Sequence, residues 1–417
     1  MENEKQIKIK AEGVTKIFGR QQKKVIQLLK EGKSKQEILK STGATVGVNQ
    51  ASFEVYAGEI FVIMGLSGSG KSTLVRLLNR LIEPSAGQIL IDGKDVVSMS
   101  KEEIRNVRRK KLSMVFQRFA LFPHKTVLQN TEYGLEIQGV DKQERSKKAM
   151  ESLKLVGLVG YENQYPDQLS GGMQQRVGLA RALANDPDVL LMDEAFSALD
   201  PLIRKDMQDE LLELQGSMEK TIVFITHDLD EALRIGDRIA LMKDGNIVQI
   251  GTPEEILMNP SNEYVERFVE DVDLSKVLTA GHIVKRAETV QLDKGARLAL
   301  KIMKDSGLST VYVVDKQKKL VGVVTAVEAS RAVEKNLSLA DVVQKDVKTV
   351  DTKTLLVDLF DDVSNAQIPV AVVDEDNRLR GIVIRGAVIG ALAGNDTYIN
   401  DYRSDDPLPQ SDESEAL

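Results

Sequence analysis

The stretch from Gly65 to Thr73 reads GLSGSGKST and contains the residue types needed to hold a nucleoside triphosphate. Glycines let the main chain curl so that its N–H groups face phosphate oxygens, and the N-terminus of a following helix adds to this attraction. The lysine of such a loop reaches the β- and γ-phosphates, and the next hydroxyl holds Mg²⁺. The predicted ligands of ATP are Gly65, Ser67, Gly68, Ser69, Gly70, Lys71, Ser72 and Thr73, with Ser72 also on Mg²⁺.

A pair of acids, Asp193 and Glu194, follows the apolar run 189–192. Alone, such a pair is common at strand ends and has no particular meaning. Beside a phosphate-binding loop, we expect Asp193 to hold Mg²⁺ through water. The adjacent Glu194 would then polarise the attacking water as the general base of hydrolysis.

The elements around these residues favour an α/β domain over residues 1–268. Apolar strand-like runs alternate with amphipathic stretches, which is typical of a largely parallel sheet. The strand-like runs are 59–65, 189–194, 221–226, and the pair 238–242 and 246–250 on either side of a turn at 243–245. Because a strand leads into Gly65 and a helical stretch follows the loop, a glycine-rich turn with a coincidental lysine is the weaker alternative.

The segment from Leu169 to Arg176, LSGGMQQR, resembles the signature motif of ABC ATPases, and the resemblance extends over most of residues 1–268. It implies that this segment opens a helix and binds the γ-phosphate of an ATP held by a second subunit. The signature residues would be Ser170, Gly171, Gly172 and Gln174. The resemblance further assigns Gln117 to the loop that senses Mg²⁺ and touches the permease, and His227 to the switch on the γ-phosphate. It assigns the segment from Ser197 to Asp200 to a loop across the dimer.

One more ATP contact follows from the same resemblance. Phe18, in the segment VTKIFG, occupies the place where the family usually has an aromatic ring that stacks on adenine. The alternative is an ordinary core phenylalanine in the first strand pair.

The ABC family works as a dimer, because one subunit's phosphate loop and another's signature motif bind opposite sides of the same ATP. The resemblance therefore implies that two copies of this chain close around two molecules of ATP with Mg²⁺. It also implies a membrane permease partner, which is fused to or works with a solute-binding receptor. The chain is thus expected at the cytoplasmic face of the cell membrane, attached through the permease.

The composition of the 417 residues is that of a globular protein, with 42% hydrophobic and 29% charged residues. The length suggests two or three domains. No apolar run approaches the ~18 residues that span a bilayer, and the N-terminus MENEKQIKIK lacks the apolar core of a secretory signal. The absence of cysteine excludes thiolate metal sites, and a net charge of −7 argues against nucleic acid as a partner.

Residues 20–44 are predicted to be a basic helical insert. Forty-six residues separate Phe18 from Gly65, more than most ABC ATPases have, and two short amphipathic helices are expected around Gly32. From Arg20 to Lys40 there are seven basic and two acidic residues on an otherwise acidic chain. A solvated decoration is the simpler interpretation. The alternative is a surface that meets anionic lipid headgroups and weakens with salt; the short helices and the overall acidity argue against DNA.

The region after residue 280 contains a repeat with an offset of 59 residues. The segments 311–315 and 320–324 recur as 370–374 and 379–383, each copy being strand, turn, strand with helical stretches around it. Two small α/β modules packed as a pair are therefore predicted, and the pair resembles tandem CBS domains. The expected boundaries are a linker at 269–282, modules at 283–340 and 341–400, and a disordered acidic tail at 401–417.

The insert and the repeat together resemble the ATPase of osmoprotectant importers, the glycine betaine and proline betaine family. CBS pairs in that family regulate transport by ionic strength or by cyclic di-AMP. Many CBS pairs bind adenosine nucleotides through G-x-x-[ST]-x-x-D, but the pattern here ends in Glu328 and has Ile384 and Ala387 in the second copy, which weighs against AMP or ATP. A ligand between two CBS pairs would leave Arg385 as a candidate phosphate contact. A purely structural dimerisation module is the alternative.

Three functions follow from these features. The favoured one is the ATPase subunit of an osmoprotectant importer, and glycine betaine as the solute depends on the resemblance because the solute does not touch this chain. The second is the ATPase of an ABC importer for another solute, such as an amino acid. The third is a soluble ABC ATPase, although such proteins usually carry two ATPase cores in one chain.

Overall fold

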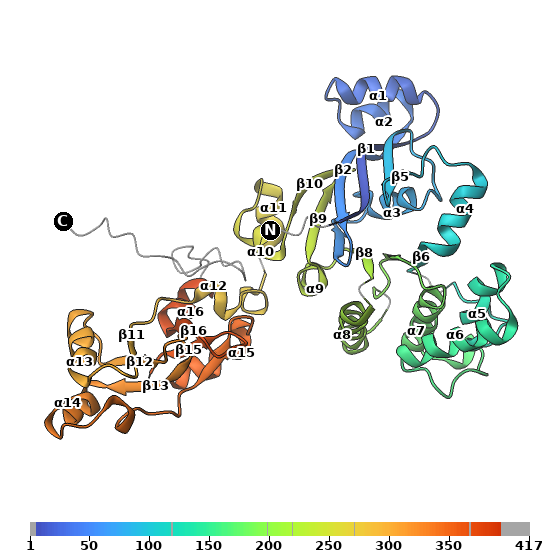
Figure 1. Cartoon of the computed structure of the whole chain (residues 1–417). Helices are drawn as coiled ribbons and strands as arrows, with labels where there is room; N and C mark the ends of the chain where they lie inside the picture. The colour runs from blue at the N-terminus through green and yellow to red at the C-terminus, as the bar shows by residue number, and fades with distance from the viewer. Residues whose placement is uncertain are drawn as a thin grey trace. The chain divides into compact units, whose positions relative to one another are not determined.

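The computed structural model describes residues 6–392, except 118–119, 198, 219, 271 and 367. The chain divides into two compact units, 1–271 and 272–417 (Figure 1). The predicted acidic tail at 401–417 lies outside the described residues. Within the part of the chain that is described, no helix is both long and apolar enough to cross a membrane.

The central sheet of unit 1 has six strands in the order β10-β9-β3-β8-β7-β6. Neighbouring strands are parallel except in the β9–β10 hairpin. The strands are β3 (Ile60–Met64), β6 (Leu112–Val115), β7 (Val189–Asp193), β8 (Thr221–Thr226), β9 (Arg238–Lys243) and β10 (Asn246–Gly251). Every residue of β3, β7 and β8 is buried, as in a parallel sheet covered on both faces. The predicted largely parallel sheet is confirmed.

A second, antiparallel sheet of unit 1 has the order β2-β1-β4-β5. Its strands are β1 (Ile7–Phe18), β2 (Thr45–Tyr56), β4 (Ala86–Ile91) and β5 (Lys94–Asp95). Apolar residues from both sheets share one core with helix α3 (Lys71–Leu78). Phe53 of β2 stacks on Phe61 of β3 with ring centroids 5.3 Å apart. This shared core fixes the start of α3 against both sheets.

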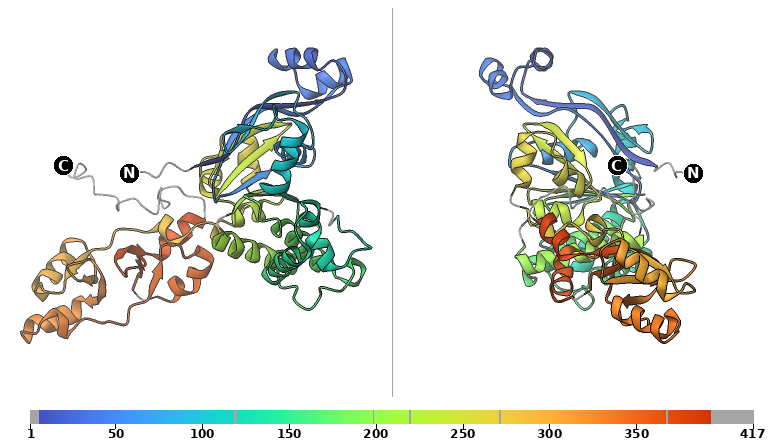
Figure 2. Two further views of the ribbon diagram at one scale, coloured as in Figure 1. Left: turned by 45° about the vertical axis from the view of Figure 1, so that its right-hand side comes forward. Right: turned by 90° about the vertical axis from the view of Figure 1, so that its left-hand side faces the viewer.

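The other helices of unit 1 follow the strands. They are α4 (Lys101–Lys110), α5 (Val127–Ile137), α6 (Lys142–Leu155), η1 (Pro166–Gln168), α7 (Gly171–Leu183), α8 (Pro201–Met218), α9 (Leu229–Ile235), α10 (Pro253–Met258) and α11 (Glu263–Val269). Helices α5, α6 and α7 pack on one another and form a helical group apart from the antiparallel sheet (Figures 1 and 2).

The insert folds as two helices, α1 (Gln22–Lys30) and α2 (Lys35–Thr42), at the end of the β1–β2 hairpin (Figure 2). Val25 and Ile38 are fully buried against the ends of β1 and β2. Ser34 and Glu37 form a capping box that begins α2. The insert is thus a folded part of unit 1, as its amphipathic pattern predicted.

Unit 2 contains the predicted repeat. Its elements are η2 (Leu274–Lys276), α12 (Ala280–Ile283), β11 (Thr289–Gln291), α13 (Ala296–Asp305), β12 (Thr310–Val314), β13 (Leu320–Thr325), α14 (Ala326–Glu334), η3 (Leu339–Asp341), β14 (Thr349–Asp351), α15 (Leu356–Asn365), β15 (Val370–Val373), β16 (Leu379–Val383) and α16 (Arg385–Leu392). The sheets β11-β12-β13 and β14-β15-β16 each join one parallel and one antiparallel pair.

The repeated glycines Gly322 and Gly381 have the same structural cause. A Cβ on Gly322 would lie 2.2 Å from the carbonyl oxygen of Gln344, and one on Gly381 would lie 2.4 Å from that of Lys285. At both places a segment from outside the sheet pairs with the residue that follows the glycine: Gln344 pairs with Val323, and Lys285 pairs with Ile382. A side chain would block this pairing, so each copy keeps a glycine for close approach.

Candidate functional site

The phosphate-binding loop connects the end of β3 to the first residue of α3. Gly70, at the N-cap of α3, has φ +109°, and a Cβ there would lie 2.3 Å from the carbonyl oxygen of Gly47. A Cβ on Gly65 would lie 2.2 Å from the carbonyl oxygen of Met242. The loop is therefore clamped between β2 and the β9–β10 hairpin, and only glycine fits at both positions.

The interior of the loop carries polar groups suited to phosphate. The Oγ of Ser69 is buried and has no hydrogen-bond partner among the residues that the structure describes. The ammonium of Lys71, on a side chain only 4% exposed, donates to the carbonyl oxygens of Gly65 at 2.7 Å and Leu66 at 3.2 Å. Burial lowers the pKa of Lys71, while the carboxylates of Glu194 and Asp193 act to raise it. An orphaned hydroxyl and a buried ammonium fit a polyphosphate ligand.

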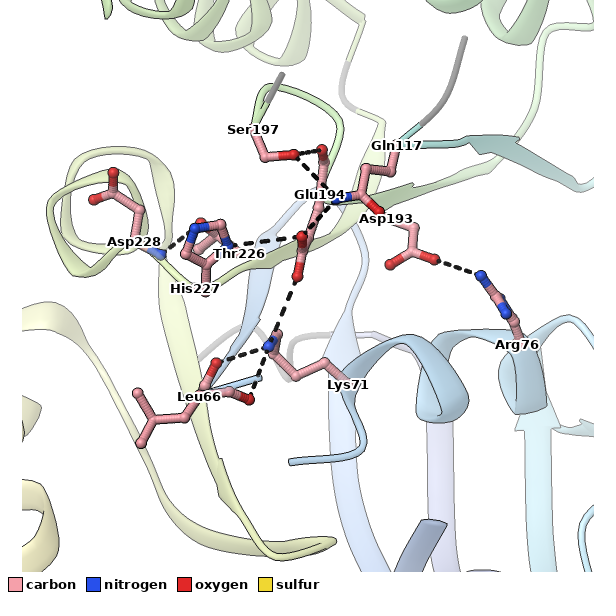
Figure 3. A network of polar contacts seen from close by, with 11 residues as sticks. Leu66, Lys71, Arg76, Gln117, Asp193, Glu194, Ser197, Thr226, His227 and Asp228 are labelled. Atoms are coloured by element: carbon pink, nitrogen blue, oxygen red, sulfur yellow. Dashed lines mark hydrogen bonds and ion pairs between the residues drawn. The ribbon is translucent and has the colours of Figure 1, made fainter. Parts of the chain in front are cut away.

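Glu194 lies at the centre of a cluster that collects residues from four parts of the chain (Figure 3). One carboxylate oxygen lies 3.8 Å from the Lys71 ammonium. The other accepts a hydrogen bond of 3.0 Å from the Gln117 amide and lies 3.6 Å from Nδ1 of His227. These contacts bring the predicted base, the predicted Mg²⁺-sensing glutamine and the predicted switch histidine together around one carboxylate.

The proposed Mg²⁺ ligands lie on adjacent elements. Asp193 is the last residue of β7 and its side chain is almost fully buried. Ser72 is the second residue of α3, which packs against β7. The carboxylate of Asp193 lies 3.4 Å from the guanidinium of Arg76 (Figure 3). A hydroxyl and a carboxylate at the mouth of the phosphate loop are the oxygen donors that Mg²⁺ prefers.

Phe18 lies beside the start of α3, at the end of β1. Gly47 separates its ring from Thr73: a Cβ on Gly47 would lie 2.8 Å from the ring and 3.2 Å from the Thr73 methyl. The Phe18 side chain is 41% exposed, so the alternative of a core phenylalanine is wrong. An exposed ring next to a phosphate loop can stack on a base.

The signature segment forms the N-terminus of α7. The Oγ of Ser170 caps this helix by accepting from the main-chain N–H of Met173, and Gly171 is exposed beside it. The amide of Gln174 donates to the carbonyl oxygens of Pro166 at 2.9 Å and Leu169 at 3.2 Å, which holds the preceding turn. Gly172 packs against the side chain of Ile203.

The structure separates these signature residues from the Glu194 cluster. Among the described residues, the hydrogen bonds and ion pairs of Lys71 and Glu194 include none to the signature segment. Asp200 likewise acts locally, since its carboxylate accepts from the main-chain N–H of Ile203 at the start of α8. An exposed helix N-terminus outside the cluster is what binding of a second subunit's nucleotide requires.

Arg76 of the cluster was missed from the sequence, and Ser197 was expected only in the loop across the dimer. Arg76 reaches Asp193 across 117 positions of sequence, and Ser197 lies 3.4 Å from the Gln117 amide across 80. Contacts of such separation leave no local pattern. Only the position of Arg76 on α3, one turn after Ser72, could have suggested that it faces the same site.

In unit 2, Arg385 lies at a cavity of about 210 Å³ between α15 and α16. The cavity is lined by Phe360, Val363, Ser364, Arg385, Val388 and Ile389. The guanidinium of Arg385 donates to the main-chain oxygen of Ser364. In the first copy, Glu328 accepts from the Thr325 main-chain N–H and from the Gln344 amide. The carboxylate that replaces the nucleotide-binding acid therefore serves as a helix cap.

Comparisons with known proteins agree with this arrangement. The ABC transporter family model matches residues 48–197, and the CBS domain model matches residues 280–335 and 339–394. The glycine betaine transport ATP-binding protein OpuAA of Bacillus subtilis (strain 168) is 74% identical over 398 residues, which is 95% of each chain. The glycine betaine/carnitine transport ATP-binding protein GbuA of Listeria monocytogenes serotype 1/2a (strain 10403S) is 62% identical over 94% of this chain and 99% of its own.

A solved structure extends the comparison to unit 1. The ATP-binding cassette MJ0796, a dimer in a post-hydrolysis state bound to ADP and Pi, is 33% identical with a TM-score of 0.50. The match covers 59% of this chain and 98% of that one. The chain therefore belongs to the ABC transporter ATPases, in the family of the glycine betaine transport ATP-binding proteins, as its phosphate loop, its paired CBS domains and its identity to these relatives show.

Proposed function

We propose that this chain hydrolyses ATP to energise uptake of glycine betaine or a related quaternary-ammonium osmoprotectant through a membrane permease. The observation that carries this proposal is the 74% identity to OpuAA over 95% of both chains, which includes the insert and the CBS pair. A match confined to the ATPase core would leave the solute open, because that core is shared by importers of many solutes. Because the similarity extends over unit 2, which contains the CBS pair, it favours osmoprotectants as the transported solutes.

The residues of the cluster divide the work of hydrolysis. Lys71 would bind the β- and γ-phosphates, and Ser72, Asp193 and Gln117 would hold Mg²⁺, which neutralises developing phosphate charge. Glu194 would accept the proton of the attacking water. His227, with a side chain 56% exposed and 3.6 Å from Glu194, is free to turn toward the γ-phosphate.

Two copies of the chain would complete each site. Ser170 and the exposed N-terminus of α7 offer a hydroxyl and main-chain N–H groups to the γ-phosphate of the other subunit's ATP. Because these groups lie outside the chain's own cluster, ATP binding would draw two subunits together, and hydrolysis would release them. The dimeric MJ0796 cassette supports this arrangement.

A cavity of about 250 Å³ near Gln117 would receive the permease. It lies between the central sheet and helices α5 and α7, and its apolar lining includes Leu81, Met114, Phe116 and Tyr133. Phe116 directly precedes Gln117. Insertion of a permease helix here would therefore shift the side-chain amide of Gln117, which contacts Glu194. This partner would hold the chain at the cytoplasmic face of the membrane.

Regulation is proposed for the CBS pair and the insert. The cavity at Arg385 combines apolar side chains with one guanidinium, a setting that suits a cyclic dinucleotide such as cyclic di-AMP. The basic insert exposes Leu39, at 49%, among its lysines, and this surface suits anionic lipid headgroups. Screening of such contacts by salt would make transport sensitive to ionic strength.

The test is uptake of radiolabelled glycine betaine by the complete transporter in liposomes, with internal salt and cyclic di-AMP varied. We expect ATP-dependent uptake that rises with internal salt and falls with the dinucleotide. Arg385→Met should abolish the response to the dinucleotide, whereas Arg331→Met, at an exposed position on α14, should keep it. Absence of betaine uptake would refute the solute; uptake that ignores salt and dinucleotide would refute the regulation and leave the ATPase assignment intact.

A further inference from the structure

Lys35 of the insert lies against the turn between β9 and β10. A Cβ built on Gly245 would lie 2.8 Å from the Lys35 ammonium nitrogen and 2.9 Å from its Cε. The same point lies 3.0 Å from the carbonyl oxygen of Gly47. Although Lys35 begins a helix of the insert, its ammonium therefore reaches the β9–β10 turn and the neighbouring main chain of β2.

This turn is part of the wall of the nucleotide site. The main-chain N–H of Gly245 donates to the carbonyl oxygen of Ser69 in the phosphate loop at 2.8 Å. A Cβ on Gly70 would lie 2.3 Å from the Gly47 oxygen and 3.5 Å from the Gly245 Cα. Thus Gly245 and the main chain of Gly47 lie between the Lys35 ammonium and the loop that binds phosphate.

The position of Gly47 shows which part of the nucleotide Lys35 faces. Gly47 lies between the Phe18 ring, on the base side, and Thr73, which follows Lys71 and Ser72 on the phosphate side. Lys71 itself lies deeper, within 3.8 Å of Glu194 at the γ-phosphate end. A nucleotide with its base on Phe18 and its γ-phosphate at Lys71 would place its ribose and α-phosphate beside Gly47. Lys35 lies on the carbonyl side of Gly47.

The charge of Lys35 is poorly compensated in the structure. Its side chain is half-buried, and within the described part of the chain its ammonium has no ion pair or hydrogen bond. Burial lowers the pKa of Lys35, and the carboxylate of Asp244 opposes this effect. By contrast, Lys33 pairs with Glu37 at 3.5 Å, and Lys40 is exposed to solvent. A partly desolvated ammonium that has no direct ion pair is unfavourable, and an anionic ligand relieves it.

We propose that the insert supplies a nucleotide contact, in which the Lys35 ammonium binds the ribose and α-phosphate edge of the bound nucleotide. This inference goes beyond hydrolysis at the Lys71–Glu194 cluster, and it requires only that the chain binds ATP. Since ADP and ATP share the ribose and the α-phosphate, Lys35 contributes equally to the binding of both. The insert is then a component of the nucleotide site as well as a surface feature.

The experiment is isothermal titration calorimetry on the full chain with Mg²⁺, using unlabelled ADP and a non-hydrolysable ATP analogue. Unlabelled nucleotides are needed because a fluorophore on the ribose would occupy the proposed contact. Lys35→Met is expected to weaken both ligands about tenfold, or roughly 1.4 kcal/mol, and to reduce the salt dependence of binding. Lys35→Arg should retain most of the affinity. Lys40→Met, on the same helix, should bind as the wild type does.

Four results would overturn the proposal. If the Lys35→Met variant binds both ligands as the wild type does, Lys35 makes no contact with the nucleotide, and the ATPase function remains intact. Weakened binding of the ATP analogue alone would place Lys35 at the γ-phosphate instead. Equal loss in the methionine and arginine variants, with an unchanged salt dependence, would mean that Lys35 only positions the insert. A wild-type chain that binds neither nucleotide would refute the ATPase assignment as well.

Discussion

Replacement of Glu194 by glutamine tests the central assignment of the site. The change is isosteric, and the new side chain can still accept from the Gln117 amide, now 3.0 Å from the carboxylate. It cannot take a proton from water, so we expect hydrolysis to fall about 10²- to 10⁴-fold. ATP affinity should rise, because a negative charge near the phosphates is removed. For charges about 5 Å apart at an effective dielectric constant of about 20, Coulomb's law gives about 3 kcal/mol as an upper limit.

The assay is phosphate release by the full chain, combined with size-exclusion chromatography in ATP. The Glu194→Gln variant should accumulate as an ATP-bound dimer, since closure no longer ends in hydrolysis. Glu102→Gln provides the matched control, because among the described residues this exposed carboxylate pairs with Arg105 alone, on the surface of α4. Turnover by Glu194→Gln within threefold of the wild type would refute the role of Glu194 as the base.

Three further predictions concern nucleotide affinity and stability. Phe18→Ala should weaken ADP binding by about 1–3 kcal/mol in calorimetry and leave the melting temperature nearly unchanged, because the ring is 41% exposed; a large loss of stability would contradict this. Gly70→Ala should lower the unfolding free energy by about 2 kcal/mol or more, since its φ is +109° and its Cβ would meet a carbonyl oxygen at 2.3 Å; near-native stability in urea would be unexpected. The pKa of Asp92 lies below its usual value, because hydrogen bonds and ion pairs with Lys111 and Lys8 outweigh the opposing effect of burial. These pairs therefore stabilise the fold at pH values above the pKa of Asp92 in the unfolded chain, and this stabilisation is lost as pH falls through its pKa in the folded chain. Asp92→Asn should lower the unfolding free energy by about 1 kcal/mol near pH 7 and by progressively less below pH 4. A loss of stability that does not change with pH would refute the reasoning.

Features that depend on residues close together in the sequence, or on a fixed repeat, were predictable from the sequence. The phosphate loop is readable because a strand, a glycine loop and a helix must follow one another within a few residues for N–H groups to face a phosphate. The CBS repeat is readable because its fold recurs at a fixed offset, and the register confirms it: Val313 pairs with Gly322 as Val372 pairs with Gly381. The two helices of the insert followed from their amphipathic spacing.

Some roles suggested by sequence depended on where the chain packs. Phe18 could have been core or surface, since the residue type permits both, and the end of β1 leaves its ring exposed. Glu328 looks like a variant of a nucleotide-binding acid, yet it caps its own helix and accepts from Gln344. A side chain with several possible partners binds the one that the fold brings near it.

What the sequence alone determined about this protein is the position of its glycine-rich loop and acidic pair and the division into a P-loop unit and a repeat, because local spacing encodes both. Tertiary structure decided which distant residues share a site. Gln117, Glu194 and His227 meet because their strands lie in one parallel sheet whose carboxyl ends point the same way. Lys35 reaches the nucleotide wall because the insert packs on the β1–β2 hairpin beside the β9–β10 turn, a proximity between segments more than 200 positions apart that no local pattern records.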